Sequence, residues 1–107
     1  MSVRFALEVR VKPGAEQDFR ERYEALARRI AEGLDGHVSH QLCQSRDEPD
    51  RWLIASEWES FEASQAWERS EEHRELTMPL RACWDDARRV AYDVRVDTRR
   101  GAYETRT

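Results

Sequence analysis

The 107-residue sequence has almost no lysine and no segment in which positive charge is concentrated. Lys12 is the only lysine, and the arginines alternate with acidic residues in segments such as RFALEVR and FRERYEALARRIAE, with a net charge of −4. Such alternation is typical of exposed helix faces with ion pairs, whereas nucleic-acid binding requires a basic face. We therefore expect no nucleic-acid partner.

Long apolar segments are also absent. Arg4 and Glu8 interrupt the apolar residues near the start, and no run of 18 apolar residues occurs. The sequence therefore predicts no signal peptide, no membrane-spanning helix and no membrane partner. Cys43 and Cys83 form no CxxC pair and lack the spacing of metal ligands, so we expect free thiols in a cytoplasmic protein.

The residues that are present suffice for one compact domain. Charged residues make up 37% of the chain and apolar residues 39%, and nine of the ten aromatic residues lie before residue 98, which is not the pattern of a disordered chain. We predict a domain over residues 1–97. The remaining residues, 98–107, show no periodicity and are predicted to form a C-terminal tail or a strand lent to a partner.

Two periodic segments fill the first third of the chain. Residues 3–12 alternate between apolar and polar side chains, which predicts a half-buried strand, and Pro13-Gly14 ends it with turn residues. Residues 15–34 carry apolar side chains at three- and four-residue spacing, which predicts an amphipathic helix.

The rest of the chain predicts three strands and a second helical region. A helix begins after the N-cap Ser60 and starts again after Ser70. Pro79 breaks or kinks it, and residues 80–88 add a further helical turn or two. The strands are predicted at residues 37–46, 51–57 and 89–96.

This order of elements predicts an α+β fold of the ferredoxin-like, split βαβ type. It would have one four-stranded antiparallel sheet with its helices on a single face. Residues 51–57 are largely apolar on both faces, so we expect this strand to be central and covered on both sides. We therefore predict a homodimer in which the second face of the sheet meets another subunit.

Several segments then resemble a known family. A PG turn follows the first strand, a DG precedes the second, and DEPDRW leads into the third; EWESFEASQAWERSEEH and VAYDVRV follow. Over residues 3–96 the chain resembles the antibiotic biosynthesis monooxygenase family of dimeric α+β barrels. The family includes cofactor-free oxygenases of aromatic polyketide intermediates, haem-degrading monooxygenases and proteins without a known reaction. In the oxygenases, the deprotonated substrate itself donates an electron to dioxygen, so the resemblance implies no cofactor.

Two departures from the family pattern limit what the resemblance implies. The polyketide oxygenases commonly have an asparagine one helical turn before the helix tryptophan, whereas this chain has Ala63 before Trp67. The haem-degrading branch has an asparagine on the first strand, near the position of Leu7, and a histidine farther from the tryptophan than His73 is. Haem degradation is therefore disfavoured, and oxygenation requires another residue in place of the amide.

Three side chains are candidates for catalysis. His73 shares a helix face with Leu76 and Leu80, so it should point inward, where burial would keep it neutral and able to accept a proton. The alternative is a core histidine or a capping partner. His40 lies on the apolar face of its strand and could face His73. Trp67 lies on the apolar helix face and would line the pocket, act in catalysis or pack in the core.

The candidates for substrate binding come from the sheet and from the end of the helical region. Tyr92 is in phase with the valines of its strand and would donate a hydrogen bond to a phenolic or quinone oxygen. Arg81 follows the proline kink and would receive an acidic substrate group or remain solvated. The apolar candidates are Phe5, Leu7 and Trp58.

No metal site is predicted. His37 and His40 are three positions apart, and in a regular strand such positions face opposite sides, so the two imidazoles should not meet.

These observations lead to one hypothesis and one alternative. The hypothesis is a homodimeric enzyme that oxygenates an aromatic, polyketide-like molecule without a cofactor, or carries out a related deprotonation-driven step such as cyclisation. His73 or His40 would be the base. The alternative is a non-catalytic small-molecule-binding or accessory protein of the same fold.

Overall fold

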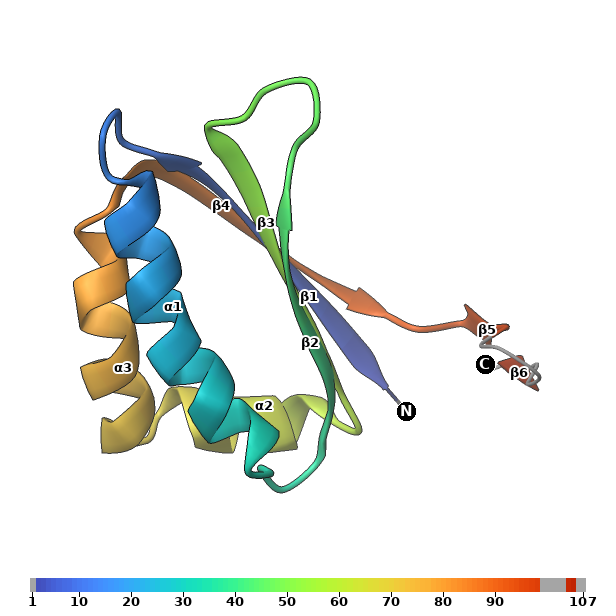
Figure 1. Ribbon diagram of the computed structural model, residues 1–107. Helices are drawn as coiled ribbons and strands as arrows, with labels where there is room; N and C mark the ends of the chain where they lie inside the picture. The colour runs from blue at the N-terminus through green and yellow to red at the C-terminus, as the bar shows by residue number, and fades with distance from the viewer. Residues whose placement is uncertain (1, 99–103, 106–107) are drawn as a thin grey trace.

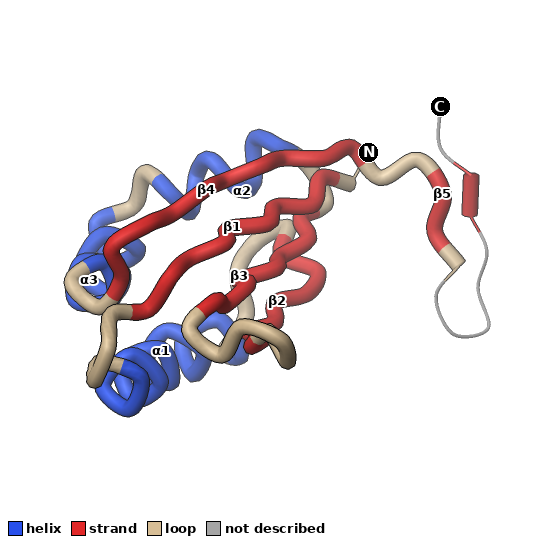
Figure 2. Tube along the Cα trace, turned by 90° about the horizontal axis from the view of Figure 1, so that it is seen from above, coloured by secondary structure: helices blue, strands red, loops and turns tan. Residues whose placement is uncertain are grey.

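Four strands form one antiparallel sheet, and three helices cover one of its faces (Figures 1 and 2). The computed structural model describes residues 2–98 and 104–105. The strand order is β2-β3-β1-β4. The predicted α+β, ferredoxin-like fold is thus confirmed. The elements are β1 (Val3–Val11), α1 (Glu16–Ala31), β2 (His37–Gln44), β3 (Arg51–Trp58), α2 (Phe61–Glu68), α3 (Glu71–Arg81) and β4 (Trp84–Asp93).

The strand β1 lies at the centre of the sheet and determines which residues face the helices. Its alternation places Phe5 opposite Ser56 and Val9 opposite Trp52 on β3. The helix α1 packs its apolar stripe against this face. The principal core contains Val9, Val11, Phe19, Tyr23, Leu26, Ile30, Trp52, Leu80 and Cys83.

The C-terminal part of the helical region differs from its prediction. Pro79 lies inside α3, which continues to Arg81, and β4 already begins at Trp84, so the helical turns predicted over residues 80–88 are wrong. A proline removes only one helical hydrogen bond, and Leu80, which is 1% exposed, anchors the last turn in the core. The sequence pattern did not indicate that β4 begins at Trp84, because an edge strand can carry charged residues at solvated positions.

A register shift in β2 changes the orientation of its first residues. His37 pairs with Trp58 and Ser39 pairs with Glu57, so Val38 is the extra residue of a β-bulge. As a result, His37 and His40 lie on the same, helix-facing side, with ring centroids 6.0 Å apart. The prediction that they face opposite sides is therefore wrong, because it assumed a regular strand.

The other face of the sheet is not covered by the helices (Figure 2). Even so, Ala55 and Glu57 of β3 are only 4% and 5% exposed. Beyond β4, the short strand β5 (Val96–Asp97) pairs with β6 (Glu104–Thr105). Most of the predicted tail lies outside the described residues, so the boundary at residue 97 stays a prediction. Within the described part of the chain, no helix is long and apolar enough to span a membrane.

Candidate functional site

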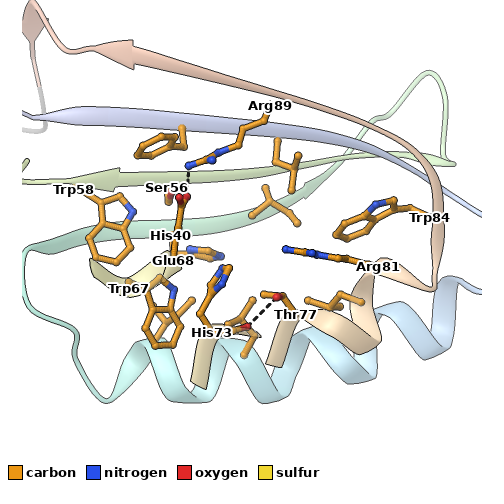
Figure 3. Close-up of a pocket in the computed structure, with 16 residues that line it drawn as sticks. His40, Ser56, Trp58, Trp67, Glu68, His73, Thr77, Arg81, Trp84 and Arg89 are labelled. Atoms are coloured by element: carbon orange, nitrogen blue, oxygen red, sulfur yellow. Dashed lines mark hydrogen bonds and ion pairs between the residues drawn. The ribbon is translucent and has the colours of Figure 1, made fainter. Parts of the chain in front are cut away.

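A cavity of about 320 Å³ lies between the helices and the sheet (Figure 3). Its apolar walls come from β1, β3, β4 and all three helices. Polar groups reach into it from β2, β3, β4, α2 and α3. The lining residues are Phe5, Leu7, Leu26, Ile30, His40, Ile54, Ser56, Trp58, Trp67, Glu68, His73, Thr77, Leu80, Arg81, Trp84 and Arg89.

The structure brings together seven of the eight residues that the sequence predicted for the site. Residues far apart in the chain meet here because the sheet register and the helical spacing point them into one space. The seven that line the cavity are Phe5, Leu7, His40, Trp58, Trp67, His73 and Arg81. Their chemical roles stay predictions.

Tyr92 is the exception, and its predicted place in the pocket is wrong. It pairs with Arg4 of β1, and its side chain lies on the face of the sheet opposite to that of Phe5, with 54% of its surface exposed. The prediction assumed that the valines of this strand face the helices. On β4, however, the helix-facing side carries Arg89 and Ala91, whereas Val90 and Tyr92 lie on the outer face.

Arg89 and Glu68 were not predicted to belong to the site. They form an ion pair across the cavity, drawn as a dashed line in Figure 3. The Arg89 guanidinium also lies over the ring of Phe5, 4.6 Å from its centroid. Arg89 lies in a charged stretch of sequence without a clear apolar face, and only the sheet register reveals that it faces the pocket opposite Leu7.

His73 and Trp67 form an edge-to-face pair, with ring centroids 5.4 Å apart and planes inclined by 78°. Ser70, the N-cap of α3, fixes their relative position. Its hydroxyl accepts a hydrogen bond from the His73 backbone N–H at 3.1 Å and donates one to the Trp67 carbonyl at 2.6 Å. A single side chain therefore joins the end of α2 to the start of α3.

The protonation of His73 follows from its surroundings. Burial is the largest influence on its imidazole and lowers its pKa below the usual 6.5, although Glu68 acts in the opposite direction. At neutral pH the imidazole is therefore uncharged, and it can accept a proton from a group in the cavity.

His40 reaches the cavity from β2, and a hydrogen bond holds its ring in place. The Tyr23 hydroxyl and His40 Nε2 share a hydrogen bond, with ring centroids 5.7 Å apart. Burial lowers the pKa of His40 to about 4, and the charge of His37 adds to this effect. His40 therefore stays neutral over the physiological range.

Ala63 does not line the cavity. It packs beside the cluster of Val3, Phe5 and Trp58, and it comes so close to Gly36 that a Cβ on that glycine would lie 2.5 Å from the Ala63 Cβ. Gly36 also has a positive φ of 76°, which favours glycine. The sixteen lining residues include no amide side chain, and Ser56 and Thr77 supply the hydroxyl groups.

Metal ligands are not clustered in the part of the chain that the structure describes. No group of three or more His, Cys, Asp or Glu side chains there could hold a metal ion.

Known proteins resemble this chain in sequence. Residues 2–77 match the family model described as antibiotic biosynthesis monooxygenase. The chain is 42% identical over 96 residues to a 42.8 kDa protein in the whiE locus of Streptomyces coelicolor, covering 90% of this chain and 24% of that protein. It is 39% identical over 79 residues to polyketide synthase CurD of Streptomyces cyaneus, covering 74% of this chain and 21% of CurD. The chain thus spans about a quarter or less of these relatives.

A solved structure resembles the chain in fold. The cofactor-independent oxygenase SnoaB from Streptomyces nogalater matches with a TM-score of 0.80 and 20% sequence identity, covering 92% of this chain and 98% of SnoaB. At 20% sequence identity, this match shows only that the two proteins share a fold.

Proposed function

This chain belongs to the antibiotic biosynthesis monooxygenase family, and on that premise we propose that it oxygenates an aromatic, polyketide-like small molecule in the cavity without a cofactor. The observation that carries the proposal is the neutral, inward-facing His73 beside the Trp67 ring in a cavity with apolar walls. Such a site can orient a flat molecule, exclude water and accept a proton.

The proposed reaction begins with proton transfer. His73 takes a proton from an acidic CH₂ group of a hydroxylated anthrone, which leaves a delocalised carbanion. The carbanion gives one electron to dioxygen, and the two resulting radicals combine to a peroxide. Loss of water from the peroxide gives the quinone carbonyl, so that CH₂ and O₂ become C=O and H₂O. The substrate supplies all the electrons.

The remaining lining residues have roles that fit a flat aromatic ligand. Phe5, Leu7 and Trp58 would contact the ring system, and Trp67 would orient it against His73. Figure 3 shows Arg81 directed into the cavity from the end of α3. Arg89 is paired with Glu68, whereas Arg81 forms no ion pair within the described residues. Arg81 would therefore receive an acidic group of the substrate.

The relatives support the substrate class. CurD is named a polyketide synthase. A related deprotonation-driven step, such as cyclisation, would use the same base but would not consume dioxygen. Haem degradation stays disfavoured, because the first strand has the apolar Leu7 near the position where that branch has an asparagine.

A non-catalytic, ligand-binding role is the second candidate. It is favoured by Ala63, since no amide replaces the missing side chain among the lining residues. In this case the aromatic residues would shape a pocket, and dioxygen would not be consumed.

We also propose that two copies associate through the face of the sheet that the helices leave uncovered. Ala6 pairs with both Ala55 and Val90, so that these three residues and Leu53 form an apolar patch across β3, β1 and β4. A strand buried on both faces suits a sheet that is covered by a second subunit.

The proposed function is tested by incubating the purified protein with a hydroxylated anthrone under air and under nitrogen. We expect dioxygen uptake and quinone formation above the spontaneous rate under air only. His73→Gln should lower the rate about 10²- to 10⁴-fold, as expected for loss of a general base. Conversion under nitrogen would instead show a step that does not consume dioxygen, and binding without conversion would point to the ligand-binding role.

A further inference from the structure

Tyr23 and His40 form a hydrogen-bonded pair between two pockets of the protein. Tyr23 lies on α1 and is 4% exposed, and its hydroxyl meets Nε2 of His40 on β2. His40 lines the cavity that also contains His73, and it lines a second, more open hollow together with Tyr23 and His37. The imidazole therefore stands in the wall between the two spaces.

The direction of this hydrogen bond follows from the donors and acceptors that the two groups offer. A tyrosine hydroxyl has one hydrogen to donate, and a buried donor without an acceptor is costly. Within the described residues, His40 Nε2 is the only partner that the structure gives to the Tyr23 hydroxyl. If Nε2 carried the proton, the Tyr23 hydrogen would lack an acceptor in the protein. The arrangement that satisfies both groups has the Tyr23 O–H donating to an unprotonated Nε2.

We propose that Tyr23 is a positioning residue that holds His40 in the tautomer protonated at Nδ1, so that His40 donates a hydrogen bond to the substrate oxygen while His73 accepts the proton. With Nε2 occupied, Nδ1 is the nitrogen left for a ligand. A neutral N–H donor stabilises the negative charge that develops on a phenolic or carbonyl oxygen when the neighbouring CH₂ is deprotonated.

The two histidines thereby receive different roles. This division rests on the proposed function, whereas the tautomer of His40 is a property of the free protein. The low pKa of His40 agrees with the division, since an imidazole that is protonated only near pH 4 is a weak base. His73 has no hydroxyl donor on its ring among the described hydrogen bonds and stays available to accept a proton.

The tautomer is tested by long-range ¹H–¹⁵N NMR of the imidazole nitrogens in ¹⁵N-labelled protein at neutral pH. We expect an unprotonated Nε2 and a protonated Nδ1 for His40. In Tyr23→Phe, which removes only the hydroxyl, the proton should shift to Nε2 in a large share of molecules. Tyr92→Phe removes a hydroxyl from the outer face of the sheet and should leave the His40 signals unchanged. A protonated Nε2 in the unchanged protein, or identical His40 signals in Tyr23→Phe, overturns the inference.

Turnover of the anthrone tests the role in catalysis. His40→Asn places an amide N–H near the position of Nδ1, and His40→Gln places it near Nε2. We expect His40→Gln to lower kcat about 10²-fold, the usual cost of losing an oxyanion donor, and His40→Asn to lower it less. Equal loss in both variants overturns the donor role. If the unchanged protein has the expected tautomer but no turnover, the proposed function fails and the assignment of the tautomer stands.

Discussion

At the scale of single residues, the cavity has one cation without a carboxylate partner. Arg81 forms no ion pair within the described residues, while Arg89 is neutralised by Glu68. A guanidinium binds a carboxylate through directed, charge-assisted hydrogen bonds. The two arginines should therefore contribute differently to substrate binding.

We predict that Arg81→Gln raises KM about tenfold or more for an anthrone that bears a carboxylate, because a hydrogen bond to a charged group is lost. The value of kcat should change little, since the acidic group is bound equally in the ground state and the transition state. Steady-state kinetics with the carboxylate-free analogue provide the control, for which KM should not change. An equal rise in KM for both compounds would show that Arg81 does not bind the acidic group.

The lowered pKa of His40 should make the free energy of unfolding depend on pH. Its pKa is lowered to about 4 in the folded protein, and the unfolded chain titrates near 6.5. Below pH 6.5 the unfolded state takes up a proton that the folded state does not accept until pH 4, so stability falls as the pH drops through this window. Between pH 7 and pH 5, His40 should account for a loss of about 2 kcal/mol in the free energy of unfolding.

Urea unfolding at the two pH values measures this loss. His40→Gln does not titrate, so its stability should fall by about 2 kcal/mol less than that of the unchanged protein over the same interval. His37 and His73 also have lowered pKa values and contribute to both proteins alike. The same pH dependence in both would contradict the proposed burial of a neutral His40.

Sequence reasoning located most of the site residues because their positions follow from simple periodicity. His73 and Trp67 lie on apolar helix faces, and Phe5 and Leu7 alternate with charged residues on a strand. Tyr92 was misplaced and Arg89 was missed because both lie on β4, whose two faces cannot be told apart by apolar content. Their orientation depends on the register with β1, which is a non-local property.

At the scale of elements, the junction between α2 and α3 holds the catalytic candidates in place. Both helices begin with a serine N-cap, Ser60 for α2 and Ser70 for α3. Only Ser70 also bonds to the Trp67 carbonyl, so it sets the geometry between the two rings as well as the start of a helix.

We predict that Ser70→Ala lowers the free energy of unfolding by about 1 kcal/mol, the usual cost of losing a cap, and also lowers kcat. Ser60→Ala is the matched control, with a similar loss of stability and a smaller loss of kcat. Urea unfolding and steady-state kinetics of both variants measure the two effects. If kcat falls equally in both, the Ser70 link between Trp67 and His73 has no special part in activity.

The order and type of the main elements could be predicted, but two irregularities could not. Pro79 indicates a break by local rules, and the helix continues because Leu80 is anchored in the core. The bulge at Val38 has no local signal, yet it brings His37 to the same face as His40. In both cases tertiary packing decides the local conformation.

At the scale of the whole molecule, the outer face of the sheet is expected to be an interface. The apolar patch of Ala6, Leu53, Ala55 and Val90 would be covered in a homodimer. We predict that the protein sediments as a dimer at micromolar concentration. Leu53→Glu should shift it to monomer, because a buried, unpaired carboxylate is costly.

Ala25→Glu serves as the control for this variant. It adds the same charge at an exposed position of α1 and should leave the dimer intact. A monomer in the unchanged protein, or a dimer that survives Leu53→Glu without loss of affinity, would show that the outer face is not the interface.

If the protein is a cofactor-independent oxygenase, the new oxygen atom of the product comes from dioxygen. Purified protein, freed of metals and flavins, is incubated with a hydroxylated anthrone under ¹⁸O₂, and the quinone is analysed by mass spectrometry. We predict one ¹⁸O atom in the new carbonyl, formed faster than without protein, and a rate near the spontaneous one for His73→Gln. Label incorporation at the spontaneous rate with the unchanged protein would contradict it.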